Sequence, residues 1–190
     1  SCSISDWPLI DKIIDAKMPI VASTGGISLS KIDEVVHHFK KNKADFAIHH
    51  CVSIYPTPIA DYNLNQIGLL SKRYRDVPIG WSTHEDPDDY TAVQLATAKG
   101  AVLFERHVGL NTKKHKLNAY SSNPEQVSLW VDAYLKGLSA LGSKQRSPSK
   151  LVERESIESL VRGVYANKSL TKGDAIKRDD VFFTKLFQSI

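Results

Sequence analysis

The stretch from Val77 to His107, VPIGWSTHEDPDDYTAVQLATAKGAVLFERH, decides the fold class of this chain because it contains a strand, a helix and a second strand. Val77–Trp81 and Ala101–Arg106 are short apolar runs of the kind that form buried strands. Asp88–Lys99 between them is typical of a helix, and Gly100 follows it where helices commonly end. This order predicts two parallel strands joined by a crossover helix.

The same unit recurs along the chain. Pro19–Ala22 and Phe46–His50 are two further apolar runs that predict strands. Helices are predicted around them at Trp7–Ala16, Ser30–Lys41, Asn63–Arg75 and Pro124–Leu141, with Ser30 as the N-cap of its helix and Asp33 three residues on. Four consecutive strand–helix units predict an α/β fold of the (β/α) TIM-barrel type, equivalent to half of an eight-stranded barrel. An open doubly wound sheet has the same local pattern and is the alternative.

The sequence changes character after this region. Residues 143–150 are rich in serine, lysine and proline and predict a linker, so residues 1–142 form the first predicted domain. A helix at Glu153–Leu160 and a strand at Val161–Ala166 are expected in residues 151–190. A segment this short buries little core of its own. It therefore reads as the beginning of a second module.

Composition excludes several function classes. The hydrophobic content of 42% and charged content of 24% are ordinary for a globular protein, and no apolar run reaches the ~18 residues of a membrane span. The net charge of +4 comes from scattered lysines and arginines without an aromatic platform, which argues against nucleic acid as a partner. A small anionic substrate suits the same charge. Cys2 and Cys51 lack a paired spacing, which fits a reducing cytoplasm.

Two histidines follow neighbouring predicted strands. His84 and His107 each come directly after an apolar run. Adjacent parallel strands lie about 4.8 Å apart, so two imidazoles at the same ends can converge on one ion. Imidazole is the commonest nitrogen ligand for divalent metals in proteins. The alternative is that each ring only packs at the end of its strand.

Hydroxyl groups also follow the strands. Ser23 comes after the first predicted strand, Ser53 after the second and Ser82 after the third. In parallel α/β folds ligands bind where the strands end, and hydroxyls with nearby backbone N–H groups can hold a phosphate. Gly25 and Gly26 would let the backbone approach such a ligand closely. A plain turn with a helix cap is the other interpretation of this region.

The most distinctive string is HCVSIYPTP, residues 50–58. Pro56 and Pro58 favour an extended loop, which could hold Tyr55 over the mouth of the barrel. A rigid surface turn with a packed tyrosine is the alternative. His49 and His50 alternate faces of one strand, so at least one of them is expected to be packed or hydrogen-bonded inside the wall.

Taken together, the string at residues 50–58, the Gly-x-Ser-x-His pattern of Gly80–His84 and the Glu105-Arg106-His107 triplet resemble one family. This is the sialic acid synthases: N-acetylneuraminate synthase and its legionaminate and pseudaminate relatives. The resemblance covers essentially the whole chain and implies a TIM barrel, here its strands five to eight, followed by the beginning of a small antifreeze-like (SAF) domain. It implies condensation of phosphoenolpyruvate with an N-acetylated amino sugar such as N-acetylmannosamine, with release of phosphate, in a homodimer.

The resemblance also implies roles for particular residues. His84 and His107 match ligands of a divalent metal, typically manganese with magnesium as the alternative. The phosphate-binding serines match Ser1, Ser23 and Ser82. Tyr55 matches a residue that contacts the sugar, with Ser53 in the neighbouring contact position, and Glu105 matches the acidic residue that precedes the second metal histidine; Tyr55 and Glu105 are the candidate catalytic residues.

Two departures from the family pattern bear on function. An acidic sugar contact after the fourth strand is absent or replaced by Asn118, which leaves the sugar acceptor open. The family's barrel begins well upstream and its first half supplies further active-site groups, so these 190 residues alone are expected to be inactive. Two alternatives therefore stand beside the synthase: a catalytically incomplete folding or oligomerisation module, and a different phosphate-binding barrel enzyme such as an aldolase.

Overall fold

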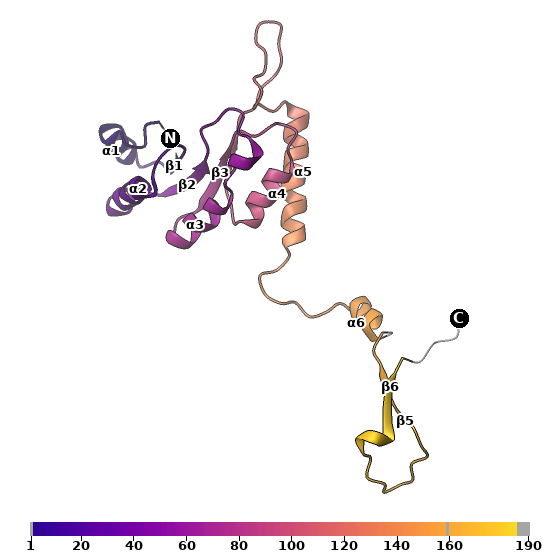
Figure 1. Ribbon diagram of the computed structural model, residues 1–190. Coiled ribbons are helices and arrows are strands. Elements are labelled where there is room, and N and C mark those ends of the chain that lie inside the picture. Colours follow the sequence, from indigo (N-terminus) through magenta and orange to yellow (C-terminus); the bar gives the residue numbers. More distant parts are fainter. Residues whose placement is uncertain (1, 159, 186–190) are drawn as a thin grey trace. The chain divides into compact units, whose positions relative to one another are not determined.

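A computed structural model of the protein describes residues 2–158 and 160–185 (Figure 1). The chain divides into two compact units, residues 1–142 and residues 143–190. The first unit carries every candidate site residue. None of the helices in the described part of the chain has the length and apolar character that a membrane crossing requires.

The first unit is built on a parallel four-stranded sheet whose order, β1-β2-β3-β4, follows the sequence. The strands are β1 (Ile20–Ser23), β2 (Phe46–Cys51), β3 (Ile79–Thr83) and β4 (Phe104–Arg106). The helices are α1 (Trp7–Asp15), α2 (Leu29–Lys41), α3 (Asn65–Arg73), α4 (Thr91–Ala98) and α5 (Pro124–Leu141), with a 3-10 turn η1 (Ile59–Asp61) before α3. The predicted parallel α/β class is confirmed. A doubly wound sheet reverses its strand order, and this sheet does not.

The two faces of the sheet differ in chemistry. Paired registers place alternate residues on the same face, and one of these faces packs against the helices through Ile20, Ala22, Phe46, Ile48, Ile79, Trp81 and Phe104. This layer and the apolar stripes of α2, α3 and α4 form the core. The opposite face carries Val21 and otherwise presents small or polar side chains: Ser23, Ala47, His49, Cys51, Gly80, Ser82 and Glu105. The face away from the helices therefore carries the candidate site residues Ser23, Ser82 and Glu105.

Several predicted element ends move by a few residues. Ser28, and not Ser30, caps α2, because its side chain accepts the backbone N–H of Lys31 at 3.3 Å. The third crossover helix begins at Thr91 instead of Asp88. Asp89 accounts for this shift, since its Oδ1 accepts the N–H groups of Thr91 and Ala92. The fourth strand is shorter than expected, although Val102 N–H still donates to the Ile79 carbonyl at 2.9 Å.

Asp33 joins α2 to α3 instead of supporting a helix cap. Its two carboxylate oxygens accept hydrogen bonds from Nε and Nη2 of Arg73 at 2.7 and 2.6 Å, and the Tyr74 hydroxyl donates to Oδ1 at 2.7 Å. The hydrogen bond from Arg73, followed by that from Tyr74, lowers the pKa of the Asp33 carboxyl.

We expect Asp33→Asn to lower the free energy of unfolding by about 1 kcal/mol at neutral pH, a modest effect because the pair is partly exposed and screened by water. A carboxyl whose pKa is lowered by folding stabilises above its unfolded pKa and loses that contribution as the pH falls through the folded value. The difference between parent and variant should therefore shrink between about pH 5 and pH 2. Urea denaturation across this range measures it, and equal stability at neutral pH would contradict the assignment.

The second unit contains α6 (Leu151–Glu158) and an antiparallel pair formed by β5 (Gly163–Ala166) and β6 (Val181–Thr184), with a 3-10 turn η2 (Arg178–Asp180) between them. The helix lies two residues earlier than predicted, and the strand starts two residues later. Among the residues that the structure describes here, only Asp180 is buried.

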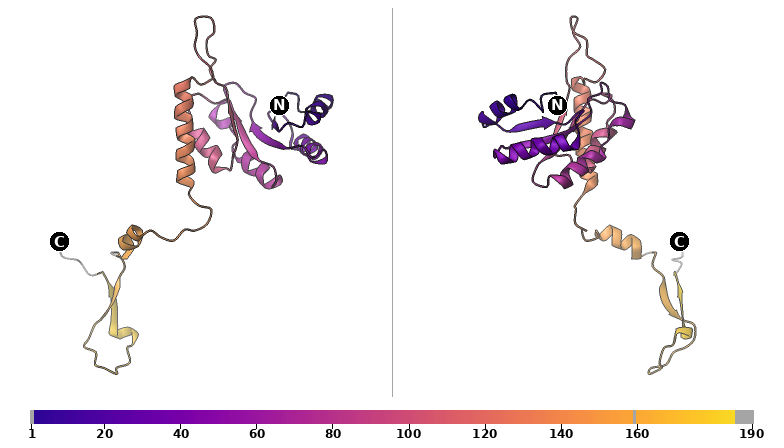
Figure 2. Two further views of the ribbon diagram at one scale, coloured as in Figure 1. Left: turned by 180° about the vertical axis from the view of Figure 1, so that it is seen from behind. Right: turned by 60° about the vertical axis from the view of Figure 1, so that its left-hand side comes forward.

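The loop between β4 and α5 stands out from the first unit. Figure 2 shows it projecting away from the sheet in both views, while α5 runs alongside α4. The helix begins with a capping box, in which Asn123 accepts the N–H of Gln126 and the Gln126 side chain accepts the N–H of Asn123. The loop leaves β4 immediately after the second candidate metal histidine. Its returning end therefore lies beside the candidate site.

Candidate active site

The structure brings His84 and His107 together. His84 follows β3 and His107 follows β4, which are paired parallel neighbours, and the centroids of the two rings lie 5.2 Å apart with their planes at 49°. His84 is buried, whereas His107 is exposed. The His84 ring is thus enclosed by protein, whereas the His107 ring is accessible at the carboxyl edge of the sheet.

The orientation of His84 follows from its hydrogen bonds. Its Nδ1 lies 2.9 Å from the carbonyl oxygen of Val52, and because a carbonyl can only accept, Nδ1 carries the proton. Its own backbone carbonyl accepts the N–H of Thr57 at 2.8 Å. Burial lowers the pKa of His84 more than the hydrogen bond to the Val52 carbonyl raises it, and the neighbouring His107 also lowers it. The ring is therefore neutral near pH 7, with the lone pair on Nε2.

Two tyrosines contact the histidine pair. The ring of Tyr55 lies 4.3 Å from that of His84, and the ring of Tyr120 lies 5.1 Å from His107, 6.2 Å from His84 and 5.2 Å from Tyr55. Tyr55 is half exposed, so its ring remains accessible to a ligand. Tyr120 is absent from the predicted site. Its position depends on the path of the loop after β4, for which the sequence carries no periodic signal.

Glu105 connects two polar side chains on the inner face of the sheet. Its Oε1 accepts the Ser82 hydroxyl at 3.0 Å, and its Oε2 lies 3.8 Å from Nδ1 of His49. His49 is buried, and burial lowers its pKa while Glu105 opposes the change. His50 points to the helix layer, where its Nε2 lies 2.8 Å from the Tyr62 carbonyl oxygen. This confirms the expectation that one of the two histidines is hydrogen-bonded inside the wall.

The remaining predicted residues do not share one cavity with the histidines, since Ser82 and His84 line one small cavity and Ser23 lines another. Ser23 and Glu105 line one cavity of about 380 Å³ beside β1. Ser53 packs against the loop after β1, where its Oγ occupies the space that a Cβ at Gly25 would need. Asn118 is exposed, and its Oδ1 accepts the N–H of Tyr120 at 3.1 Å, so its side chain organises the loop. Ser1 lies outside the described residues.

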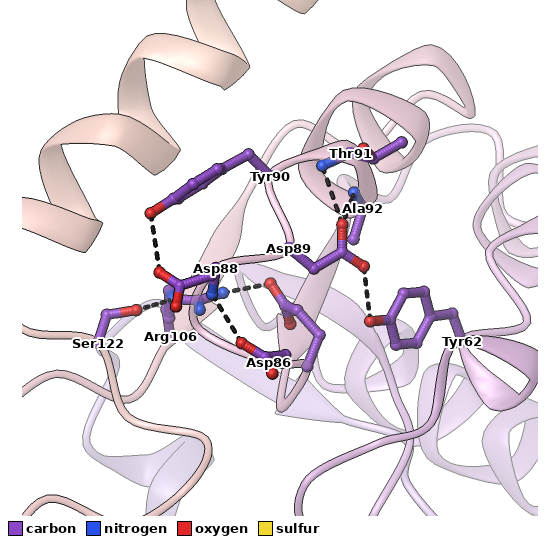
Figure 3. Close-up of polar contacts among 10 residues, drawn as sticks. Tyr62, Asp86, Asp88, Asp89, Tyr90, Thr91, Ala92, Arg106 and Ser122 are labelled. Carbon is purple, nitrogen blue, oxygen red and sulfur yellow. Dashed lines mark hydrogen bonds and ion pairs between the residues drawn. The ribbon is translucent and has the colours of Figure 1, made fainter.

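A charged pair that sequence reasoning missed lies next to the histidines. Glu85 and Arg106 are ion-paired and their side chains are nearly inaccessible. Figure 3 shows the further contact of Arg106, whose Nε donates to the Ser122 hydroxyl at 2.6 Å. The adjoining loop is held by Asp89, which accepts the Tyr62 hydroxyl at 2.8 Å as well as two backbone N–H groups at the start of α4.

The donor set fits a metal that keeps open positions. His84 presents a neutral imidazole whose proton is fixed on Nδ1 by a carbonyl, an arrangement common among metal-ligating histidines. Within residues 2–158 and 160–185, no third histidine, cysteine, aspartate or glutamate completes a cluster with metal-ligand geometry. Two imidazoles would therefore leave the remaining positions of a bound ion to water or substrate oxygens.

Consecutive parallel strand–helix units with a histidine pair at the carboxyl edge define a parallel α/β protein with a candidate site at that edge of its sheet. The chain belongs to the NeuB family, whose model matches residues 1–146. This is the sialic acid synthase family that the sequence motifs resemble.

Solved structures and curated relatives agree with this assignment. The chain is 43% identical to a spore coat polysaccharide biosynthesis protein E from Chromobacterium violaceum, with a TM-score of 0.87 over 96% of this chain and 55% of that one. It is 30% identical to an N-acetylneuraminic acid synthetase from Leptospira borgpetersenii, with a TM-score of 0.72 over 83% of this chain and 54% of that one. It is 28% identical to a pseudaminic acid synthase of Campylobacter jejuni over 95% of this chain and 52% of the relative. The chain thus spans about half the length of these relatives.

Proposed function

We propose that this chain carries one side of the active site of a nonulosonic acid synthase. The reaction would join C3 of phosphoenolpyruvate to the aldehyde carbon of an N-acetylated amino sugar such as N-acetylmannosamine, with addition of water at C2 and departure of phosphate. The observation that carries the proposal is the histidine pair, with rings 5.2 Å apart and Tyr55 against His84, beside the Ser82–Glu105 hydrogen bond. Membership in the NeuB family supports the same reaction class.

Different residues of the site would bind the sugar and the phosphoenolpyruvate. His84 and His107 would hold a divalent metal, manganese or magnesium, which when bound acts as a Lewis acid towards the sugar aldehyde. Tyr55 offers a half-exposed aromatic face to the sugar. Ser53 would add a contact to the sugar next to Tyr55. Ser23 and Ser82 would orient the phosphate group so that the reacting carbons meet.

Glu105 is the candidate proton acceptor of this set. The Ser82 hydroxyl donates to Oε1 of Glu105, with the two oxygen atoms 3.0 Å apart. A bound phosphate would therefore compete with the carboxylate for this hydrogen bond. The carboxylate is more than half exposed. Together with Ser23 it lines the cavity beside β1, where a substrate could reach it. Charge on Glu105 also favours a cation at the neighbouring histidines.

The proposal also covers the domain organisation of the enzyme. The four strands correspond to half of a TIM barrel, and residues 151–190 to the beginning of an SAF domain in a homodimeric enzyme. The remaining catalytic groups would then come from chain beyond these 190 residues.

The test is an assay of the intact protein with phosphoenolpyruvate, MnCl₂ and a panel of N-acetylhexosamines. We expect phosphate release that requires both the metal and one sugar of the panel. Phosphate release that is independent of any sugar would contradict a synthase. The 190 residues assayed alone should release no phosphate above background, because groups that act as a unit lose activity together; turnover of about 1 per second by this piece would overturn that expectation.

A further inference from the structure

Glu85 and Arg106 form a buried ion pair directly next to the two candidate metal histidines in the sequence. Glu85 follows His84, and Arg106 precedes His107. The side chain of Glu85 is 0% exposed and that of Arg106 is 5% exposed. The pair therefore bridges the ends of β3 and β4 out of contact with water.

Arg106 also reaches the backbone of His107 through a third residue. Its Nε donates to the Ser122 hydroxyl at 2.6 Å, and the backbone N–H of Ser122 donates to the His107 carbonyl at 2.9 Å. The guanidinium carbon lies 5.7 Å from the centre of the Trp130 ring of α5, within the range of a cation–π contact. One guanidinium is thus tied to Glu85 beside the first histidine and, through Ser122, to the second.

Stability alone does not account for such a pair. Removing two charges from water costs several kcal/mol for each ion, and apolar replacements of similar volume are often as stable. The cost is visible here, because Oε2 of Glu85 and Nη2 of Arg106 are buried without a hydrogen-bond partner among the described residues. The pair instead fixes the orientation of the groups around it, since the planar guanidinium of an arginine holds its hydrogen-bond partners in a set geometry.

We propose that Glu85 and Arg106 are positioning residues that hold His84 and His107 at the separation needed to share one divalent metal. Neither side chain is required to touch the metal or a substrate. The metal in this statement rests on the proposed function, whereas the fixed geometry of the two rings does not.

The test is a charge-free pair variant, Glu85→Leu with Arg106→Met, in the intact protein. The control is Asp33→Leu with Arg73→Met, which removes a different arginine–carboxylate ion pair between α2 and α3, on the helix side of the sheet. Ser122→Ala is a milder second variant, because it removes one bond to Arg106 and leaves the charges paired. Circular dichroism establishes that each protein is folded.

The first measurement uses metal-free protein and the ¹H–¹⁵N resonances of the histidine rings. We expect the signals of His84 and His107 to shift in the pair variant, to shift less in the same direction in Ser122→Ala, and to stay in place in the control. Unchanged histidine signals in Ser122→Ala and in a folded pair variant would overturn the inference. If the pair variant does not fold, Ser122→Ala alone decides in the same way.

The second measurement is a calorimetric titration with MnCl₂. Residues that orient metal ligands typically contribute 10–100-fold to affinity, so the dissociation constant should rise by about that factor in the pair variant and by less than about twofold in the control. A folded pair variant with the parent's affinity would overturn the inference. A parent that binds no manganese would contradict the metal of the proposed function, and the metal-free ring signals would still decide the positioning role.

Discussion

His107→Ala should abolish the binding of a divalent metal. The rings of His84 and His107 lie 5.2 Å apart, and no third metal-ligating side chain joins them in the described part of the chain, so each ring is one of the two candidate ligands there. Since residues that only orient a ligand contribute 10–100-fold, loss of a direct ligand should lower manganese affinity by more than about 100-fold. Isothermal titration calorimetry of the intact protein measures this.

His107 is the better of the two histidines to replace in this test. His107 is exposed, so its removal should leave folding unchanged, whereas His84 is buried and bonded to the Val52 carbonyl. His37→Ala is the matched control, because it removes an exposed imidazole from α2, away from the site. Binding of manganese by His107→Ala with the parent's affinity would place the metal elsewhere.

Gly80→Ala, at the one glycine within strands β1–β4, should strongly destabilise the fold. A Cβ at this position of β3 would overlap the Leu103 carbonyl oxygen and the ring of His49, whose Nε2 would lie only 2.7 Å away. The first neighbour is backbone and the second is buried, so neither can move freely. Overpacking of this kind costs 1–3 kcal/mol or more, and we expect a loss of about 3 kcal/mol in the free energy of unfolding.

The matched control is Gly68→Ala within α3. Its nearest atom would be the Lys99 carbonyl oxygen at 3.8 Å, an ordinary contact, and alanine is the better helix former. This variant should gain about 0.5–1 kcal/mol. Urea denaturation monitored by circular dichroism compares the two. If Gly80→Ala unfolds at the parent's urea concentration, the close approach between His49 and β3 is wrong.

The order of the elements could be predicted from the sequence because the signals involved are local. Apolar runs and helical stripes depend on residues a few positions apart, and all four strands and five helices of the first unit lie where these patterns place them. The proximity of His84 and His107 follows in the same way, since each residue directly follows a strand and the two strands are joined by one crossover. Parallel pairing then leaves the two rings at one edge.

Element ends were less predictable because competing side chains decide them. Ser28 and Ser30 are equally suitable caps by residue type, and only the path of the chain from β1 selects Ser28. Asp33 fits the cap of a helix in sequence, but a partner on α3, forty residues away, offers it two charge-assisted hydrogen bonds. Such contacts depend on how α2 packs beside α3, which no local pattern encodes.

By itself the sequence of this protein determined the fold class, the family and the histidine pair, because periodicity and short motifs report which residues end a strand. The tertiary structure alone decided which groups surround that pair. Tyr120 reaches both rings from the end of a projecting loop, and Glu85 meets Arg106 across two strands. Both contacts join residues distant in the chain, and they form only when strand register and loop path have been set by burial of the apolar face.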